Sequence, residues 1–447
     1  MRGLLLAIVC VAATAQVSFQ RDIQPVLTRQ CAACHQASNQ QSGLLATSYE
    51  GLAKGGSKGP AFVAQKPEES LLVRYLTGEQ KPQMPFGGKP LDPQQIDLFR
   101  AWIREGAKDD TAAIGTKPLP PAPVPVYKQS PLITAIAYSP DGTLMAVSGY
   151  HEILLHKVDE GKPVQLLARL PGHAMRIHGL AFSQDGKTLV ATGGDPAQAG
   201  IVQVWDVASR TLRTEENLAT DTFFGVSLSP DSTRAAFGGA DKSIRIYDIA
   251  AGKQIRKADN HEDWVFAVIF GVDGKRLVSV SRDRAAKLSD ADSGSFKENV
   301  NLLRDTLVAL ARHPKRDWVL IGGQDRIPYL YRMDRPRAMR IADDSTLIRQ
   351  FAKQDAPISA VAFSPDGSKI AVGAEVGDVR VYDAETGDLV AACKGHQGGI
   401  YALQFHPAGK TLAAAGFDGT IRIFDLSGNL ITAYVPVPIG AGQVASK

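Results

Sequence analysis

Hydrophobic residues are spaced differently in the first and second parts of the chain. Before residue 110 they recur every three or four positions, which is the spacing of one face of a helix. Two such sets are present: Phe19, Ile23, Val26 and Leu27, and then Ile96, Phe99, Trp102 and Ile103. We expect two short helices that pack together, the first of them bent or starting late because Pro25 lies within it.

The second of these helices has clear end signals. Asp92 is a good N-cap, Pro93 suits the first helical position, and Gln95 completes a capping box. Gly106 predicts the end of the helix. The first part of the chain is therefore expected to be a small all-α domain.

After residue 131 short strand-like runs alternate with turns that recur about every 44 residues, within the range of propeller blades. Seven turn tetrapeptides are found, starting at Ser139, Ser183, Ser229, Gly271, His313, Ser364 and His406. This repeat predicts an all-β propeller of seven blades, because radial stacking covers the faces and edges of four-stranded sheets. Either Val124–Tyr127 or Leu430–Val435 supplies the last outer strand.

Composition narrows the possible functions. The 447 residues carry a formal net charge of +4 that is spread along the chain, so nucleic acid is not an expected partner. Arg2, the apolar run Leu4–Ala13 and the small residues Ala13-Thr14-Ala15 are typical of a cleavable signal peptide. The run is too short to span a membrane, so we expect a periplasmic or secreted protein without a transmembrane segment after cleavage.

A proline-rich stretch separates the two patterns, with Pro118, Pro120, Pro121, Pro123 and Pro125. Such a stretch predicts a stiff, extended linker. The expected organisation is therefore a signal peptide (1–15), a helical domain (16–110), a linker (111–131), a propeller (132–437) and a C-terminal tail (438–447).

The cysteines carry the clearest chemistry. Cys31, Cys34 and His35 form a C-x-x-C-H sequence, which is the attachment signature of a c-type haem. In this motif both thiols bind the porphyrin covalently and the histidine is an axial ligand of the iron. The mature chain has no second C-x-x-C for zinc and no βαβ setting for a thioredoxin-like pair. The remaining Cys393 is expected to be a small buried residue of a strand.

Met84 is the candidate for the second axial ligand. It is the only methionine between the signal and the propeller, and Pro82 and Pro85 would stiffen the loop that carries it. A His/Met pair raises the reduction potential of haem iron. The alternative is that Met84 only fills the core. Because His35 is the only histidine of residues 16–110, two histidine ligands from this domain are excluded.

Residues 19–107 resemble a bacterial cytochrome c domain of the planctomycete type. The matching pieces are Phe19-x3-Ile23-x-Pro25, Cys31–His35, Lys54-Gly55-Gly56, Pro67–Leu71, Met84-Pro85 and Trp102-Ile103. The resemblance implies electron transfer, with Cys31 and Cys34 bound to haem, His35 as the proximal ligand and Met84 as the distal one.

Residues 132–437 resemble the WD-repeat family. Gly172-His173, His261 and Gly395-His396 match its Gly-His position, and Trp205-Asp206 matches its closing dipeptide. We expect these histidines to be structural partners of turn aspartates such as Asp283 and Asp418, rather than metal ligands.

Two apparent catalytic motifs lack the structural context that their chemistry requires. The G-x-S-x-G at residues 55–59 lacks the strand before it and the helix after it that a nucleophile elbow needs. His151 and His156 have the wrong spacing for a zincin.

The sequence favours an exported single-electron carrier with one covalent haem c and a propeller that binds protein, the redox partner being unknown. Two alternatives stay open. One is an oxidoreductase with a catalytic or second-cofactor site on the propeller, so whether the protein is an enzyme is undecided. The other is a protein-binding scaffold in which the haem is sensory or structural.

Overall fold

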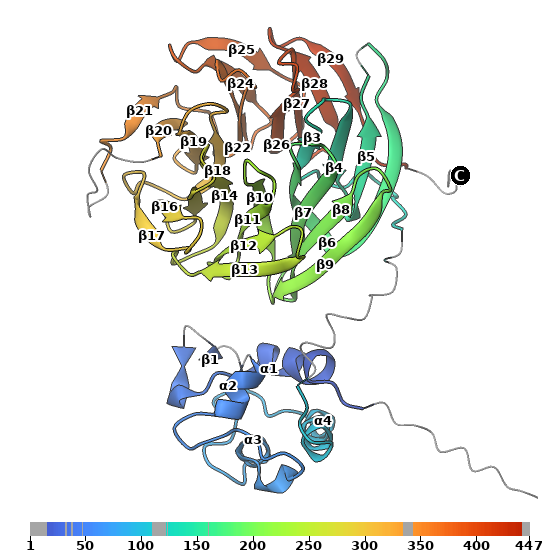
Figure 1. The fold of residues 1–447 in the computed structure, drawn as a ribbon, viewed down its shortest axis with the longest axis vertical. Coiled ribbons are helices and arrows are strands. Elements are labelled where there is room, and N and C mark those ends of the chain that lie inside the picture. The colour runs from blue at the N-terminus through green and yellow to red at the C-terminus, as the bar shows by residue number, and fades with distance from the viewer. Residues whose placement is uncertain are drawn as a thin grey trace, which may run out of the picture. The chain divides into compact units, whose positions relative to one another are not determined.

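The computed structural model describes residues 16–31, 34–36, 39–46, 48–109, 122, 124–159, 161–333 and 343–439. The expected signal peptide, most of the proline-rich linker, including Pro118, Pro120, Pro121 and Pro123, and most of the C-terminal tail lie outside these residues. The chain divides into two compact units, an N-terminal unit of residues 1–119 and a C-terminal unit of residues 120–447 (Figure 1).

The N-terminal unit consists mainly of short helices joined by long loops. In chain order they are the π-helical turn η1 (Phe19–Ile23), α1 (Gln24–Gln30), the 3-10 turn η2 (Gln41–Gly43), α2 (Tyr49–Lys54), the 3-10 turn η3 (Pro67–Glu69), α3 (Leu71–Thr77) and α4 (Pro93–Arg104). We expected a purely helical unit, but it also contains a short antiparallel pair of strands. These are β1 (His35–Gln36) and β2 (Asn39–Gln40), directly after the second cysteine of the motif.

Both helices predicted from the apolar spacing are present. The first starts late, as expected: η1 leads into α1, and Pro25 occupies the first turn of α1, where its missing N–H costs no hydrogen bond. At the second, α4, the Asp92 carboxylate accepts from the Gln95 N–H at 2.8 Å. The Gln95 side chain accepts from the Asp92 N–H at 3.3 Å, so the capping box is complete.

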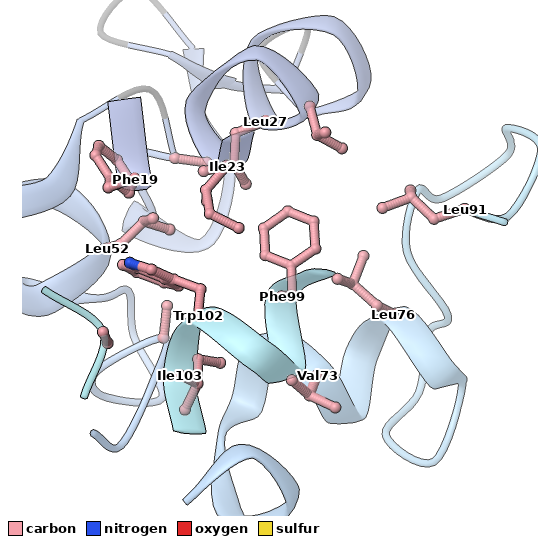
Figure 2. Packing of buried hydrophobic residues seen from close by; sticks show 14 residues of the cluster. Phe19, Ile23, Leu27, Leu52, Val73, Leu76, Leu91, Phe99, Trp102 and Ile103 are labelled. Carbon is pink, nitrogen blue, oxygen red and sulfur yellow. The ribbon is translucent and has the colours of Figure 1, made fainter. Parts of the chain in front are cut away.

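The predicted apolar faces of these helices form the core of the N-terminal unit. Figure 2 shows Phe99 of α4 among Ile23, Leu27 and Leu76, which come from the first helical segment and from α3. Phe19, Tyr49, Phe62 and Trp102 stack with ring centroids 5.0–6.2 Å apart. Of the two predicted faces only Ile96 is half-buried rather than buried. The close packing of these two apolar faces holds the ends of α1 and α3 in fixed positions.

The C-terminal unit is built from antiparallel sheets whose strands follow each other in chain order. Five sheets have four strands each: β10 (Phe223–Leu228), β11 (Arg234–Gly239), β12 (Ile244–Asp248), β13 (Lys253–Ala258); β14 (Val265–Phe270), β15 (Arg276–Ser281), β16 (Ala286–Asp290), β17 (Phe296–Asn299); β18 (Leu307–Arg312), β19 (Trp318–Gly323), β20 (Tyr329–Arg332), β21 (Leu347–Gln350); β22 (Ile358–Phe363), β23 (Lys369–Ala374), β24 (Val379–Asp383), β25 (Leu389–Cys393); β26 (Ile400–Phe405), β27 (Thr411–Gly416), β28 (Ile421–Asp425), β29 (Leu430–Tyr434).

The sixth sheet has seven strands because one of them is shared. Its members are β3 (Ile136–Tyr138), β4 (Leu144–Ser148), β5 (Tyr150–Lys157), β6 (Gln165–Phe182), β7 (Thr188–Asp195), β8 (Ala199–Asp206) and β9 (Thr211–Ala219). The first part of the long strand β6 pairs with β5, and its last part pairs with β7. One continuous strand thus completes one four-stranded set and begins the next.

The predicted turn tetrapeptides lie between the first and second strands of these sets, where the repeat pattern expects hairpins. In the first of them, the Ser139 hydroxyl donates to Asp141 at 2.5 Å and accepts from the Leu144 N–H at 2.9 Å. Asp141 also accepts from the Thr143 N–H at 3.1 Å. These bonds hold the turn closed and lower the pKa of Asp141, the serine hydroxyl contributing most.

Neighbouring sets pack side by side around a common centre (Figure 1). β3 contacts β6, and the contacts continue through β10, β14, β18, β22 and β26, which in turn contacts β3. Of the two segments considered for the last outer strand, Leu430–Tyr434 takes this place as β29, paired with β28. Tyr127, in the other segment, forms an isolated parallel bridge with Ile439.

Candidate functional site

The N-terminal unit contains a cavity of about 640 Å³. Four segments line it: the end of α1 with the residues that follow, the loop after α2, one face of α3, and the loop between α3 and α4. Most of the lining is apolar, with Leu27, Leu44, Leu72 and Leu76 among the contributing side chains. The volume lies within the range of small-molecule and cofactor sites.

Cys31, Cys34 and His35 all line this cavity. The Cys31 N–H donates to Leu27 at 2.8 Å, which makes Cys31 the C-cap of α1. The N–H groups of Cys34 and His35 both donate to the Cys31 carbonyl, at 3.2 and 3.0 Å. The His35 carbonyl accepts from the Ala46 N–H at 2.8 Å, so the motif is attached to structure at both of its ends.

The reactive groups of the motif lie in a sparsely polar environment. Burial, and then the nearby Cys34, raises the pKa of the Cys31 thiol to about 11. The Nδ1 atom of His35 is buried and has no hydrogen-bond partner among the described residues. Buried polar atoms are rarely without a hydrogen-bond partner, so we expect a partner for this nitrogen.

Met84 lies on another wall of the same cavity. Its N–H donates to the Tyr75 carbonyl at 3.0 Å, and its half-buried side chain packs against the core of the unit. Pro82 and Pro85, which flank it, both follow cis peptide bonds. Met84 therefore contacts the core and also faces the cavity, so core packing and ligand binding are not exclusive roles for this residue.

Three ionisable lining residues were not predicted as part of a site. Lys58 and Lys89 come from the two loops, and Tyr75 comes from α3. The Lys58 ammonium donates to the Tyr75 hydroxyl at 2.7 Å. For Tyr75 a signal existed in retrospect, because Leu72, Tyr75 and Leu76 have helical spacing, but nothing in the spacing of the two lysines marks them.

The G-x-S-x-G sequence also belongs to this cavity wall. It follows α2 rather than a strand, and Gly56 and Gly59 pair with each other in a tight turn. Gly55 has φ +73°, and a Cβ there would lie 1.8 Å from the Gly59 carbonyl oxygen, so the close approach of the backbone requires glycine. This turn is a wall of the cavity, in agreement with the prediction that it is not a nucleophile elbow.

Comparison with known families matches both parts of the chain. Residues 31–85, which include the four predicted haem residues, match the family described as planctomycete cytochrome C. Residues 164–206, 215–248, 252–290 and 387–425 match the WD domain, G-beta repeat, and residues 310–405 match the anaphase-promoting complex subunit 4 WD40 domain.

The chain therefore joins a segment that matches planctomycete cytochrome C to segments that match WD repeats.

The guanine nucleotide-binding protein subunit beta of Saccharomyces cerevisiae is a curated relative. It is 25% identical over 227 residues, which is 48% of this chain and 50% of the relative. The chain thus spans about half the length of this relative.

His261 and His396 lie beside the turn aspartates Asp283 and Asp418, as the sequence predicted, whereas His173 pairs with Glu215 instead of an aspartate. His261 Nδ1 lies 2.8 Å from the Asp283 carboxylate, and its Nε2 lies 2.7 Å from the Ser279 hydroxyl. His396 Nδ1 lies 3.5 Å from Asp418. Burial lowers the pKa of His261, and burial with the Arg422 guanidinium lowers that of His396 to about 4. Both rings are therefore neutral at neutral pH.

The zincin-like sequence of β5 also has a structural explanation. Glu152 is fully buried and binds Arg169 through two contacts of 2.8 Å, while His156 Nε2 lies 3.1 Å from the Pro436 carbonyl oxygen. Within the part of the chain that the structure describes, no three His, Cys, Asp or Glu side chains gather as a metal-binding group. In that same part, none of the helices has the length and apolar character needed to cross a membrane.

Proposed function

We propose that this protein is an exported c-type cytochrome that carries one covalent haem and transfers single electrons, with the WD repeats as a docking platform for another protein. The observation that carries the proposal is the shared cavity of Cys31, Cys34, His35 and Met84. Two thiols, an imidazole and a thioether are the complete set of protein groups that a haem c with His/Met ligation requires.

The residues present fit this group. An apolar cavity of about 640 Å³ suits a porphyrin, and the unsatisfied Nδ1 of His35 belongs to a ring whose Nε2 is the expected iron ligand. Cys31 and Cys34 would each add the sulfur and hydrogen of the thiol across one vinyl group. The raised pKa keeps Cys31 a neutral thiol until then. When bound, haem supplies a one-electron couple.

The protein residues determine how this couple behaves. His35 and Met84 would both hold the iron, which would leave no position for an exogenous ligand and would raise the potential. Phe86, on the loop that carries Met84, is 77% exposed although it lines the cavity. The cavity thus reaches the surface beside a solvent-exposed ring, where a redox partner would approach within electron-transfer distance.

The proposed organisation has a haem domain of residues 16–110, a linker of residues 111–131 and a propeller of residues 132–437. For the propeller we propose seven blades closed into a ring through β26 and β3. The shared strand β6, the contacts between successive first strands and the contact of β26 with β3 support this count. The name of the yeast relative, a subunit, supports a protein-binding role for the repeats.

Export and cleavage before Gln16 are part of the proposal and rest on the sequence alone. Haem attachment and export support each other, because bacteria attach c-type haem outside the cytoplasmic membrane. The N-terminal residue of the mature protein tests this: Gln16 is expected, and a mature chain that still begins at Met1 would contradict it.

Absorption spectroscopy of the purified, exported protein tests the function. We expect one low-spin haem per chain, no reaction with carbon monoxide, and a weak thioether-to-iron absorption band when oxidised, as His/Met ligation requires. A high-spin reduced form or a second chromophore would contradict the simple carrier and support the oxidoreductase alternative.

A further inference from the structure

We propose that Lys58 and Lys89 bind the two propionates of the haem, and that Tyr75 positions Lys58 for this contact. The inference rests on the proposed function, since it concerns the orientation of the porphyrin in the cavity. It assigns a role to three lining residues that take no part in haem attachment or in iron ligation.

The charges that line the cavity have a single sign. Apart from the thiols and His35, its ionisable lining residues are Lys58, Lys89 and Tyr75, and no aspartate, glutamate or arginine is among them. Haem carries two carboxylates on one edge, and a carboxylate at a partly apolar site needs cationic or hydrogen-bonding partners. The two loops that bear the lysines are the parts of the lining that meet this need.

Neither lysine has a carboxylate partner among the residues that the structure describes. No ion pair joins Lys58 or Lys89 to a described residue, although other cations of the unit do form such pairs: Lys66 with Glu69, Arg74 with Glu79, and Arg100 with Glu68 and Asp97. The unit therefore has carboxylates to offer, and the two cavity lysines are left free for a ligand.

Lys58 is held in place before any ligand binds. Its ammonium group donates to the Tyr75 hydroxyl at 2.7 Å and lies 5.4 Å from the centroid of the Tyr75 ring. It sits in the turn that Gly56 and Gly59 close by two backbone bonds of 3.1 and 3.0 Å. An ammonium group has three donors, so two remain for a carboxylate after the bond to Tyr75.

Lys89 approaches from the loop that carries Met84. Leu91, two residues later, is buried in the core, and Met84, five residues earlier, is fixed through its N–H to Tyr75. The loop is thus anchored on both sides of Lys89. The same loop would then contact the iron through sulfur and the propionate edge through an ammonium group.

This contact predicts an effect on the reduction potential. A positive charge near the haem favours the reduced form, which carries one positive charge less than the oxidised form, and so raises the potential. Loss of Lys58 or Lys89 should therefore lower the potential without changing the axial ligands. The effect should be larger than for a lysine that does not reach the propionates.

The experiment uses the full exported chain with its haem attached. The variants are Lys58→Gln, Lys89→Gln and Tyr75→Phe, with Lys58→Arg as the variant that retains the charge. Lys54→Gln is the matched control, because Lys54 is exposed at the end of α2 and does not line the cavity. The measurements are haem retained after denaturation, the midpoint potential at fixed ionic strength, and the propionate bands in redox-difference infrared spectra.

We expect both glutamine variants to keep the haem, to titrate at a lower potential than Lys54→Gln, and to shift the propionate bands. Tyr75→Phe should change the potential in the same direction but less, and Lys58→Arg should stay near the wild type. Potentials and bands identical to those of Lys54→Gln would overturn the inference while leaving the haem proposal intact. A wild-type chain without covalent haem would instead overturn the proposed function.

Discussion

His35 and His261 differ in what their ring nitrogens contact. In the N-terminal unit His35 faces a cavity and its Nδ1 has no partner among the described residues, whereas in the C-terminal unit both nitrogens of His261 are hydrogen-bonded. The cysteines differ similarly: Cys31 lines the cavity, and Cys393 is buried in β25. A residue with the same chemistry serves binding where it faces a cavity and stability where its partners lie within the fold.

The largest expected effect concerns the cysteines. Replacement of Cys31 and Cys34 together by serine should abolish covalent haem, because no thioether bond can then form. Cys393→Ser should leave haem attachment unchanged. The amount of haem retained after denaturation and solvent extraction measures this difference. Equal retention in the two variants would contradict the assignment of haem attachment to Cys31 and Cys34 and of a structural role to Cys393.

The methionines provide the next test. Met84→Leu should keep the covalent haem but lose the thioether band, lower the potential and allow carbon monoxide to bind, because one axial position opens. Met145, which is fully buried in β4, is the matched control. Met145→Leu should cost less than about 1.5 kcal/mol of stability, as a volume-conserving core change, and leave the spectrum unchanged. A wild-type spectrum in Met84→Leu would assign Met84 to core packing alone.

His261→Ala should affect only stability. It removes a buried ring that bonds Asp283 and Ser279, and the loss leaves these groups partly unsatisfied, at a cost of about 2–3 kcal/mol in the free energy of unfolding. Chemical denaturation measures this cost, and the haem spectrum of the folded protein should not change. An altered spectrum with unchanged stability would indicate that His261 has a ligand-binding role.

A smaller effect is expected from pH. The pKa of His396 is about 4 in the folded chain, against an ordinary value of 6.5, because of burial and the neighbouring Arg422. The unfolded chain therefore takes up the proton first as pH falls. The contribution of neutral His396 to the free energy of unfolding is fully present above pH 6.5 and is lost as the pH falls toward 4. At pH 5 this loss is on the order of 2 kcal/mol.

Unfolding of wild type and His396→Gln at pH 7.5 and pH 5 tests this dependence. The variant should be less sensitive to pH over this interval, whatever its stability at neutral pH. An equal loss of stability in both proteins would contradict the role assigned to His396 burial.

Local signals predicted the elements that depend on them. The caps of α4 and the late start of α1 at Pro25 follow from residues a few positions apart. The hairpin turns and the pairing of His261 with Asp283 follow from the repeat. By contrast, the part of the cavity lined by Lys58, Tyr75 and Lys89 depends on contacts between segments distant in sequence. The spacing of hydrophobic residues does not predict such contacts. The short ladder after His35 was missed because two-residue strands carry no alternating pattern.

The most direct test of the account is the amount of covalently bound haem in the exported, full-length protein. After denaturation and extraction with acidified solvent, the polypeptide should retain one haem per chain, with the thiols of Cys31 and Cys34 both blocked and that of Cys393 free. A colourless polypeptide with all three thiols free would contradict the central claim.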